Sequence, residues 1–310
     1  MKNQIKTQFG KNIHPVLLAL SATLLAGTAH GQLFVDNYGN GTIGEYTTSG
    51  ATVNASLISG IGSSYGLALD GNGNLFVGNA HTGNIGEYTT SGATVNADLI
   101  SGVGGYGLAL DGNGNLFVSS LGTIGEWTTS GATVNANLIS GLNEVFEFTL
   151  DRNGNLFVAD YGADTIGEYT ISGGVVASSN PSLISGLSNP ISLALDGNGN
   201  LFELNSGNGT IGEYTTSGAT VNADLISGIS GTAEGLALDE NGNLFVANTS
   251  SSTIGEYTTS GATVNADLIS GLSAPTALAI ESTPEPSTSV LAGAVMLALL
   301  AFKKFRRHAA

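Results

Sequence analysis

The chain has 310 residues, of which 46 are glycine and 41% are hydrophobic, and it contains no cysteine. The hydrophobic content excludes an intrinsically disordered chain, which needs low hydrophobicity and high charge. The lack of cysteine excludes a disulfide scaffold, thiol catalysis and cysteine-ligated zinc or iron–sulfur centres.

Charge is distributed very unevenly. Between Gln32 and Glu281 the only Lys or Arg is Arg152, while this span holds 23 of the 24 acidic residues, a net charge of −22. A domain of this charge repels phosphate backbones, which excludes nucleic acid as a partner. Cations and neutral polar polymers remain as partners.

The N-terminal residues 1–31 are predicted to be a secretory signal peptide. Lysines 2, 6 and 11 give a positive start, and Val16 to Gly27 form an apolar core too short for a stable membrane span. Small residues, Ala29 and Gly31, stand at −3 and −1 of a cleavage site before Gln32. The alternative is a buried helix of the fold.

Residues 32–281 contain six copies of one unit. Leu-Phe recurs from residue 33 to residue 244 at intervals of 40 to 45 residues, and Ile-Gly-Glu-Tyr (Trp once) follows each time. Five copies share a nearly identical Thr-Thr-Ser-Gly-Ala-Thr-Val-Asn-Ala segment, from which the fourth copy departs at 170–180. Self-similarity with this period is typical of repeat architectures.

Each unit contains four short strand-like runs and no helical period. In the second copy these runs are Gly66–Asp70, Leu75–Val77, Ile85–Tyr88 and Ala97–Ile100, and a Gly-Asn-Gly turn joins the first two. Four strands per unit, repeated six times, predict an all-β, six-bladed β-propeller over 32–281.

The phase of the repeat predicts how the ring closes. The repeats begin at Leu33 with the second strand of a unit, and they end at 276–281 with the first strand of a unit. We expect these two strands to pair in one shared sheet, which removes two sheet edges.

The unit resembles the NHL repeat. The matching residues are Tyr65 to Val77 and Asn84 to Tyr88, and the match extends over 33–281. The resemblance implies a propeller, a fold that hosts both binding proteins and enzymes. The third strand of that family usually opens with Arg, whereas this chain has Thr or Asn at 42, 84, 123, 165, 210 and 253. A basic binding surface is therefore not expected.

Two repeated acidic positions favour structural roles. Asp70-Gly-Asn-Gly-Asn74 starts like a calcium loop but lacks the later Gly and Glu of that motif, so we interpret the Asp as an acceptor for the backbone of its own turn. Calcium binding by these loops is the alternative. The strand glutamates are expected to bond to a neighbouring blade's backbone or Thr hydroxyl; they are Glu45, Glu87, Glu126, Glu168, Glu213 and Glu256.

Positions that differ between copies mark a candidate binding site. The residues before the first strand of each blade, which are Tyr65, Tyr106, Phe146, Ile191, Glu234 and Thr276, are expected to surround the central mouth on the face of one set of loops. The candidate binding residues are Tyr65, Tyr106, Glu147, Glu203 and Glu234. Neutral drift between duplicated blades is the alternative.

These residues lead to a non-catalytic binding or extracellular-matrix module as the expected function. No catalytic residue, metal ligand or cofactor is assigned. The alternative is a metal-dependent gluconolactonase-like or lyase-like enzyme, whose metal would be held by Glu147, Glu203, Asn205 and Glu234. The streptogramin-inactivating lyases rely on a catalytic His, and His81, the one His of the ring, is interpreted as an exposed loop residue.

The C-terminus is predicted to carry a sorting signal. A proline-rich linker at 282–288 precedes an apolar helix at 289–302 and a basic cytoplasmic tail at 303–310. Pro284, Glu285 and Pro286, the helix and the tail resemble the PEP-CTERM signal, although Thr283 stands where that family often has Val.

The resemblance implies a destination for the chain. It would be exported across the inner membrane, held transiently by the helix, and cleaved by an exosortase-type sorting protease. It would then reach the cell surface or the extracellular matrix, where polysaccharide is a partner. A plain C-terminal membrane anchor is the alternative.

Overall fold

The computed structural model describes residues 31–229 and 232–281. The predicted signal peptide (apart from Gly31), sorting motif, apolar helix and basic tail lie outside these residues. Within the described residues no helix has the length and apolar character to cross a membrane. The helical structure described there is one short 3-10 turn, η1 (Tyr161–Ala163).

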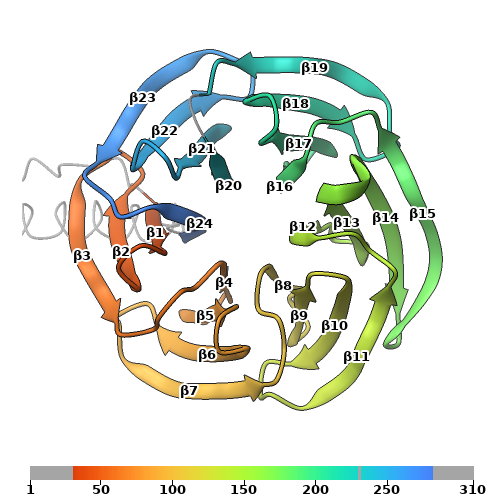
Figure 1. Cartoon of the computed structure of the whole chain (residues 1–310), viewed down its shortest axis with the longest axis horizontal. Helices are drawn as coiled ribbons and strands as arrows, with labels where there is room; N and C mark the ends of the chain where they lie inside the picture. Colours follow the sequence, from red (N-terminus) through yellow and green to blue (C-terminus); the bar gives the residue numbers. More distant parts are fainter. Residues whose placement is uncertain (1–30, 230–231, 282–310) are drawn as a thin grey trace, which may run out of the picture. The chain divides into compact units, whose positions relative to one another are not determined.

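The described residues form six four-stranded antiparallel sheets arranged around a central axis (Figure 1). We number these sheets as blades 1 to 6. Strands β4 to β23 supply blades 2 to 6 in chain order, four to a blade. The six-bladed, all-β propeller predicted from the repeats is therefore confirmed.

Blades 2 to 4 have their innermost strand first. Their bounds are β4 Gly66–Leu69, β5 Asn74–Asn79, β6 Asn84–Thr89 and β7 Thr94–Ser101; β8 Leu108–Leu110, β9 Asn115–Ser120, β10 Thr123–Thr128 and β11 Thr133–Ser140; β12 Val145–Leu150, β13 Asn155–Asp160, β14 Thr165–Ser172 and β15 Val175–Ser185.

Blades 5 and 6 repeat the pattern. Their bounds are β16 Pro190–Leu195, β17 Asn200–Asn205, β18 Thr210–Thr215 and β19 Thr220–Ser227; β20 Ala233–Leu238, β21 Asn243–Asn248, β22 Thr253–Thr258 and β23 Thr263–Ser270.

Blade 1 joins the two ends of the ring. Its strand order is β24 (Pro275–Glu281), β1 (Gln32–Asn37), β2 (Thr42–Thr47) and β3 (Thr52–Ser59). β24 and β1 are antiparallel, with Gln32 opposite Glu281 and Val35 opposite Leu278. The predicted closure is confirmed, and it leaves no free edge at the junction.

The outermost strand of each blade is longer than the sequence indicated. In blade 2 it begins at Thr94, three residues before the expected start at Ala97. The cause is a tight connection, in which Gly92 N donates to Thr89 O at 2.8 Å and Thr89 N donates to Ala93 O at 2.8 Å. The Thr-Val-Asn residues therefore continue the strand instead of forming a loop, although they are exposed.

The core lies between neighbouring blades. Between blades 2 and 3, for example, Phe76 and Ile85 of one blade pack against Leu116, Val118 and Trp127 of the next. Such clusters recur around the ring, and each blade contributes an almost fully buried Phe, namely Phe34, Phe76, Phe117, Phe157, Phe202 and Phe245. Burial of these apolar surfaces holds adjacent blades together.

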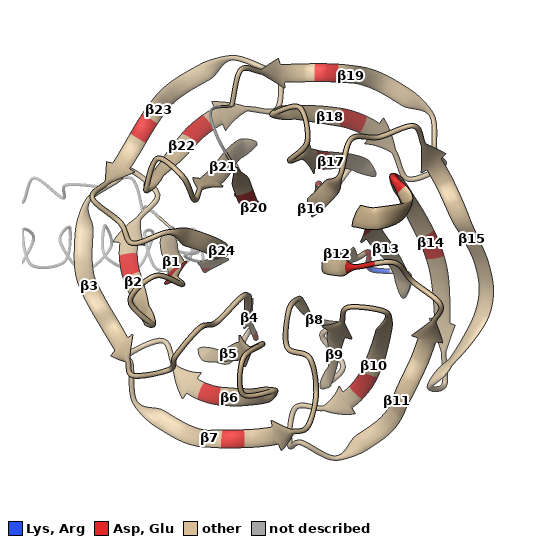
Figure 2. Cartoon of the chain, viewed as in Figure 1, with Lys and Arg blue, Asp and Glu red and all other residues tan. Residues whose placement is uncertain are grey.

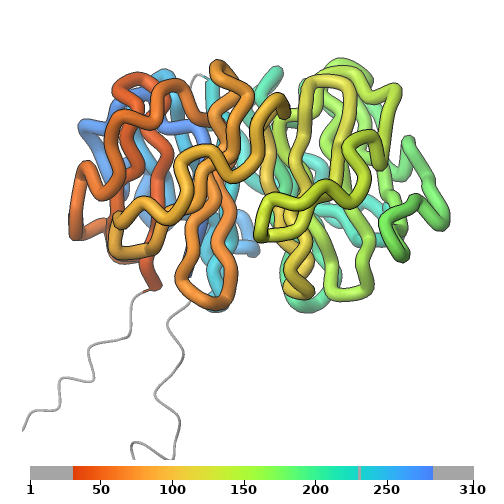
Figure 3. The backbone as a smooth tube through the Cα atoms, turned by 90° about the horizontal axis from the view of Figure 1, so that it is seen from below, coloured from red at the N-terminus to blue at the C-terminus, as the bar shows by residue number. Residues whose placement is uncertain are grey.

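The ring has two loop-bearing faces (Figure 3). One, here called the turn face, carries the tight turns between the first two strands of each blade, the connections between the last two strands, and both Gln32 and Glu281. The other, here called the mouth face, carries the connections between the second and third strands and those between blades. This division follows from the antiparallel strand order of every sheet.

Candidate functional site

The predicted mouth residues lie together. All six predicted residues line one central pocket, together with Glu147 and Ala277; Tyr65 and Tyr106 precede their innermost strands, whereas Phe146, Ile191, Glu234 and Thr276 are the second residues of theirs. The pocket volume is about 20 Å³, which is room for about one water molecule. This pocket is therefore too small to hold a sugar or lactone, and a ligand that uses these residues must lie over them on the mouth face.

Five aromatic rings continue from this pocket across blades 1 to 4. Successive ring centroids are 4.8 Å apart for Tyr38 and Tyr65, 5.6 Å for Tyr65 and Tyr106, 5.8 Å for Tyr106 and Phe146, and 5.3 Å for Phe146 and Tyr161. We call these five residues the aromatic arc. Each ring is partly exposed, so the arc offers a continuous, amphipathic contact surface.

Of the arc, the sequence identified Tyr65 and Tyr106 as binding residues, and it placed Phe146 at the mouth. Tyr38 and Tyr161 were missed because they lie in connections between the second and third strands, where the copies differ in length. Tyr38 follows β1, and Tyr161 lies in η1 of blade 4. The signal that could have found them is their aromatic character in loops that the propeller topology directs to the mouth face.

Two carboxyl groups lie in the central pocket. Glu147 Oε2 accepts a hydrogen bond from Ser192 Oγ, which in turn accepts one from the backbone N–H of Leu236 at 2.9 Å. Burial raises the pKa of Glu147 to about 8, with the Ser192 bond opposing the rise. Glu147 is therefore largely protonated at neutral pH and links the innermost strands of blades 4, 5 and 6.

Glu234 lies on the opposite side of the pocket from the middle of the arc. Burial raises its pKa, and its charge is one of the influences that raise the pKa of Tyr65. The larger influences on Tyr65 are burial and the neighbouring Tyr38 hydroxyl. The mouth thus combines aromatic surface with carboxyl and phenol groups.

Glu203 does not line this pocket. It is fully buried in β17 of blade 5, where the equivalent residue of other blades is Val. Its Oε2 accepts a hydrogen bond from Asn205 Nδ2 at 2.5 Å, and its Oε1 has no hydrogen-bond partner. Burial raises the pKa of Glu203 well above its usual value, and the hydrogen bond from Asn205 opposes this rise.

The residues of the enzyme alternative do not fit a shared metal centre. Glu147 is bonded to Ser192, and Asn205 Oδ1 accepts the Ser188 backbone N–H at 2.7 Å. In residues 31–229 and 232–281 no group of three or more His, Cys, Asp or Glu side chains is arranged to hold a metal ion.

The turn aspartates act as expected. Asp70 Oδ1 accepts the backbone N–H groups of Asn72 at 2.9 Å and Asn74 at 2.8 Å, and Asp70 Oδ2 accepts the Nδ2 groups of the same two residues. These bonds outweigh burial and lower the pKa of Asp70. The same arrangement recurs at Asp111, Asp151, Asp196 and Asp239.

The strand glutamates form a regular ring of acidic side chains. Figure 2 shows one red band on the third strand of each blade, namely β2, β6, β10, β14, β18 and β22. Their expected partners are not the ones observed. Glu45 Oε1 accepts from Gln32 Nε2 at 2.8 Å within its own blade, and Glu126 Oε2 is buried with no partner. His81 is exposed after β5, as expected.

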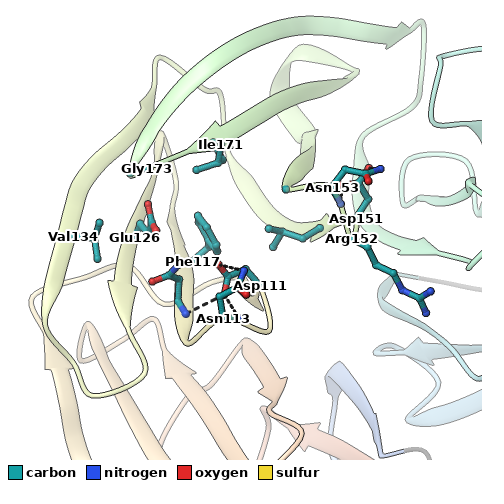
Figure 4. Close-up of a pocket in the computed structure, with 14 residues that line it drawn as sticks. Asp111, Asn113, Phe117, Glu126, Val134, Asp151, Arg152, Asn153, Ile171 and Gly173 are labelled. Atoms are coloured by element: carbon teal, nitrogen blue, oxygen red, sulfur yellow. Dashed lines mark hydrogen bonds between the residues drawn. The ribbon is translucent and has the colours of Figure 1, made fainter.

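A second pocket, which sequence reasoning did not find, opens on the turn face between blades 3 and 4 (Figure 4). It has a volume of about 480 Å³, within the range of small-molecule sites. The sequence signal was the departure of the fourth copy at 170–180, which lengthens β14 and β15.

Comparisons with known proteins agree with this fold. No protein-family model matches the chain, and no curated protein matches it. Among solved structures, the nidogen/laminin complex contains a chain similar to this one, with a TM-score of 0.65 and 16% identity over 81% of this chain and 98% of that chain.

Two enzymes of known structure are also similar in fold. A gluconolactonase from Xanthomonas campestris has a TM-score of 0.57 and 17% identity, covering 82% of this chain and 84% of that chain. A virginiamycin B lyase from Staphylococcus aureus has a TM-score of 0.50 and 17% identity, covering 72% of this chain and 71% of that chain. The chain is therefore a six-bladed β-propeller similar in fold to these structures, and its function has to be argued from its own residues.

Proposed function

We propose that this chain is an exported, non-catalytic binding module that holds neutral extracellular polysaccharide on its mouth face. The observation that carries the proposal is the aromatic arc. Tyr side chains provide large, rigid and amphipathic contact area at low cost in conformational entropy. The flat apolar face of a sugar ring can cover such a surface while its hydroxyl groups bond to the phenol and carboxyl oxygens nearby.

Electrostatics select the kind of polymer. Arg152 is the only Lys or Arg between Gln32 and Glu281, and it lies in a turn on the opposite face from the arc. An acidic polymer would meet net repulsion at the mouth, where Glu234 contributes. A neutral polymer meets no such penalty, which is why we infer neutral rather than uronic-acid chains.

Binding of the purified chain to neutral glucans, measured by isothermal titration or affinity electrophoresis, tests this proposal. Tyr106→Ala should weaken binding by about tenfold or more, equivalent to about 1.4 kcal/mol. Tyr106→Phe keeps the ring and should retain most of the affinity. The proposal fails if both variants bind as the unsubstituted chain does, or if the chain binds none of a panel of neutral polysaccharides.

We further propose export and sorting as the route to this partner. Residues 1–31 would direct export, and Pro284, Glu285 and Pro286 would direct cleavage by an exosortase-type protease after transient anchoring by the helix at 289–302. Replacing these three residues with Ala should leave the chain in the membrane fraction of the producing cell. Release of that variant at the normal rate would contradict the sorting proposal.

A further inference from the structure

The blade 3–4 groove, the pocket of about 480 Å³ on the turn face, is bordered by the hairpin in which blade 4 departs from the repeat, whereas a pocket of about 440 Å³ at blades 5 and 6 is formed by regular copies. β14 and β15 have 8 and 11 residues, where the corresponding strands of blade 3 have 6 and 8. Gly173 and Gly174, both with positive φ, form the turn of this longer hairpin. Asn135 Nδ2 donates to Gly174 O at 3.0 Å, which ties the hairpin to the outer strand of blade 3.

Glu126 is the unusual side chain of this groove. It is 3% exposed, and its Oε2 is buried without a hydrogen-bond partner. Figure 4 shows its carboxyl group between Val134 and Phe117, directed toward the hairpin that carries Gly173. The corresponding Glu87 of blade 2 is less buried, and the third and fourth strands of the next blade, β10 and β11, are not lengthened there. A buried carboxyl oxygen without a partner is costly unless the group takes up a proton or a ligand supplies a donor.

The other polar groups of the groove also accept hydrogen bonds. Asp111 is close enough for its charge to raise the pKa of Glu126, after the larger effect of burial. Asn113 and Asn115 each use one Nδ2 hydrogen on Asp111, which turns these amides toward the carboxylate and leaves their amide oxygens available to a ligand as acceptors. The Arg152 guanidinium points away from Glu126 in Figure 4.

Apolar side chains form the rest of the wall. They are Phe117, Val134, Leu150 and Ile171. A ligand that fits must therefore supply hydrogen-bond donors, preferably with positive charge, on a body that has an apolar face.

We propose that the blade 3–4 groove is a second binding site, which takes a small organic molecule with a protonated primary amine, such as an amino sugar, and that Glu126 binds the ammonium group. An N⁺–H donor to Oε2 satisfies the unpartnered oxygen and offsets the proximity of Asp111. The body of the ligand lies against Phe117 and Ile171. This site lies on the other face of the ring from the aromatic arc and does not depend on it.

Titration of the purified chain with D-glucosamine tests the proposal, with D-glucose as the uncharged control. Glucosamine should bind at one site and glucose should not. Glu126→Gln should weaken glucosamine binding by about tenfold or more, and Glu87→Gln, the matched change in blade 2, should leave it unaltered. Tyr106→Ala should also leave it unaltered, which separates this site from the proposed polysaccharide site.

A second variant keeps the test decisive if Glu126→Gln fails to fold. Val134 is 45% exposed at the edge of the groove, so Val134→Lys introduces a tethered ammonium group beside Glu126 and should abolish glucosamine binding. Val95→Lys, at the matched position of blade 2, which is 53% exposed, should have no effect. The proposal is overturned if the chain does not bind glucosamine, if it binds glucose equally well, or if it binds calcium at this site instead. Undiminished glucosamine binding by Glu126→Gln or Val134→Lys would also overturn it.

Discussion

The ring of Tyr214 lies directly over the backbone of Gly212 in the third strand of blade 5. A Cβ atom built on Gly212 would be 2.6 Å from Cε2 of Tyr214, which is closer than real Cβ contacts allow. The same contact recurs in every blade, with Trp127 over Gly125 in blade 3. The glycine of the Ile-Gly-Glu-Tyr motif is therefore required by the aromatic side chain two residues later.

Gly212→Ala should destabilise the fold by about 1–3 kcal/mol, because the Tyr214 ring has to leave its position on the strand. Denaturant unfolding followed by tryptophan fluorescence or circular dichroism measures the change. Gly197→Ala is the control, since nothing lies within 4 Å of a Cβ at that position. Equal stabilities of the two variants would show that the ring does not require the glycine.

Leu278→Ala should weaken the closing sheet. Leu278 is 5% exposed in β24 and packs in a cluster with Leu33 and Val35 of β1. Loss of this buried side chain should cost about 2–5 kcal/mol of unfolding free energy. Val264→Ala, at a rim position that is 53% exposed, should change it by less than about 0.5 kcal/mol. A small loss at Leu278 would mean that β24 contributes little to holding the ring.

Asp36 should make the fold less stable as the pH rises. It is fully buried, and burial raises its pKa from 3.8 to about 7 against the opposing hydrogen bond from Ser64 Oγ at 2.6 Å. Between these pH values the unfolded chain loses the proton while the folded chain keeps it, so stability falls from about pH 4 to pH 7 and then levels off. The full effect corresponds to about 4 kcal/mol.

Asp36→Asn removes this titration. The stability of the variant relative to the unsubstituted chain should therefore increase steadily between pH 4 and pH 7, as measured by urea unfolding at a series of pH values. A constant difference across that range would contradict the raised pKa.

The turn aspartates should act in the opposite direction. Hydrogen bonds from Asn74 and Asn72 lower the pKa of Asp70 despite its partial burial, so its contribution is present above the unfolded pKa and is lost as the solution is made more acidic. Asp70→Ala should cost about 1 kcal/mol at neutral pH and less below pH 3. Asp224→Ala, on an exposed outer strand, is the control, and an equal loss in both variants would argue against the turn role.

The repeats allowed the ring, its blade number and its closing sheet to be predicted before the structure. Near-identical copies reveal strand order and phase, and Leu33 with the strand at 276–281 was enough to place the junction. The outer strands were predicted too short because exposed Thr-Val-Asn residues carry no apolar signal, and their strand structure depends on the tight turn at Thr89–Ala93.

Site prediction was less complete for a physical reason. The residues at the start of each innermost strand lie at the mouth because symmetry places equivalent positions around one axis, and Tyr65 and Tyr106 followed from that. Glu203 was expected beside them. It lies in the second strand of blade 5, β17, where its side chain is buried inside the fold. The environment of Glu126 could not be predicted, because it depends on how the hairpin of blade 4 leans over blade 3.

Both ends of the ring leave from one side, because Gln32 and Glu281 are paired neighbours in blade 1. The chain therefore enters and leaves the ring on the turn face. An attachment at either end of the ring would then be on the same face as the blade 3–4 groove and on the opposite face from the five rings of the aromatic arc.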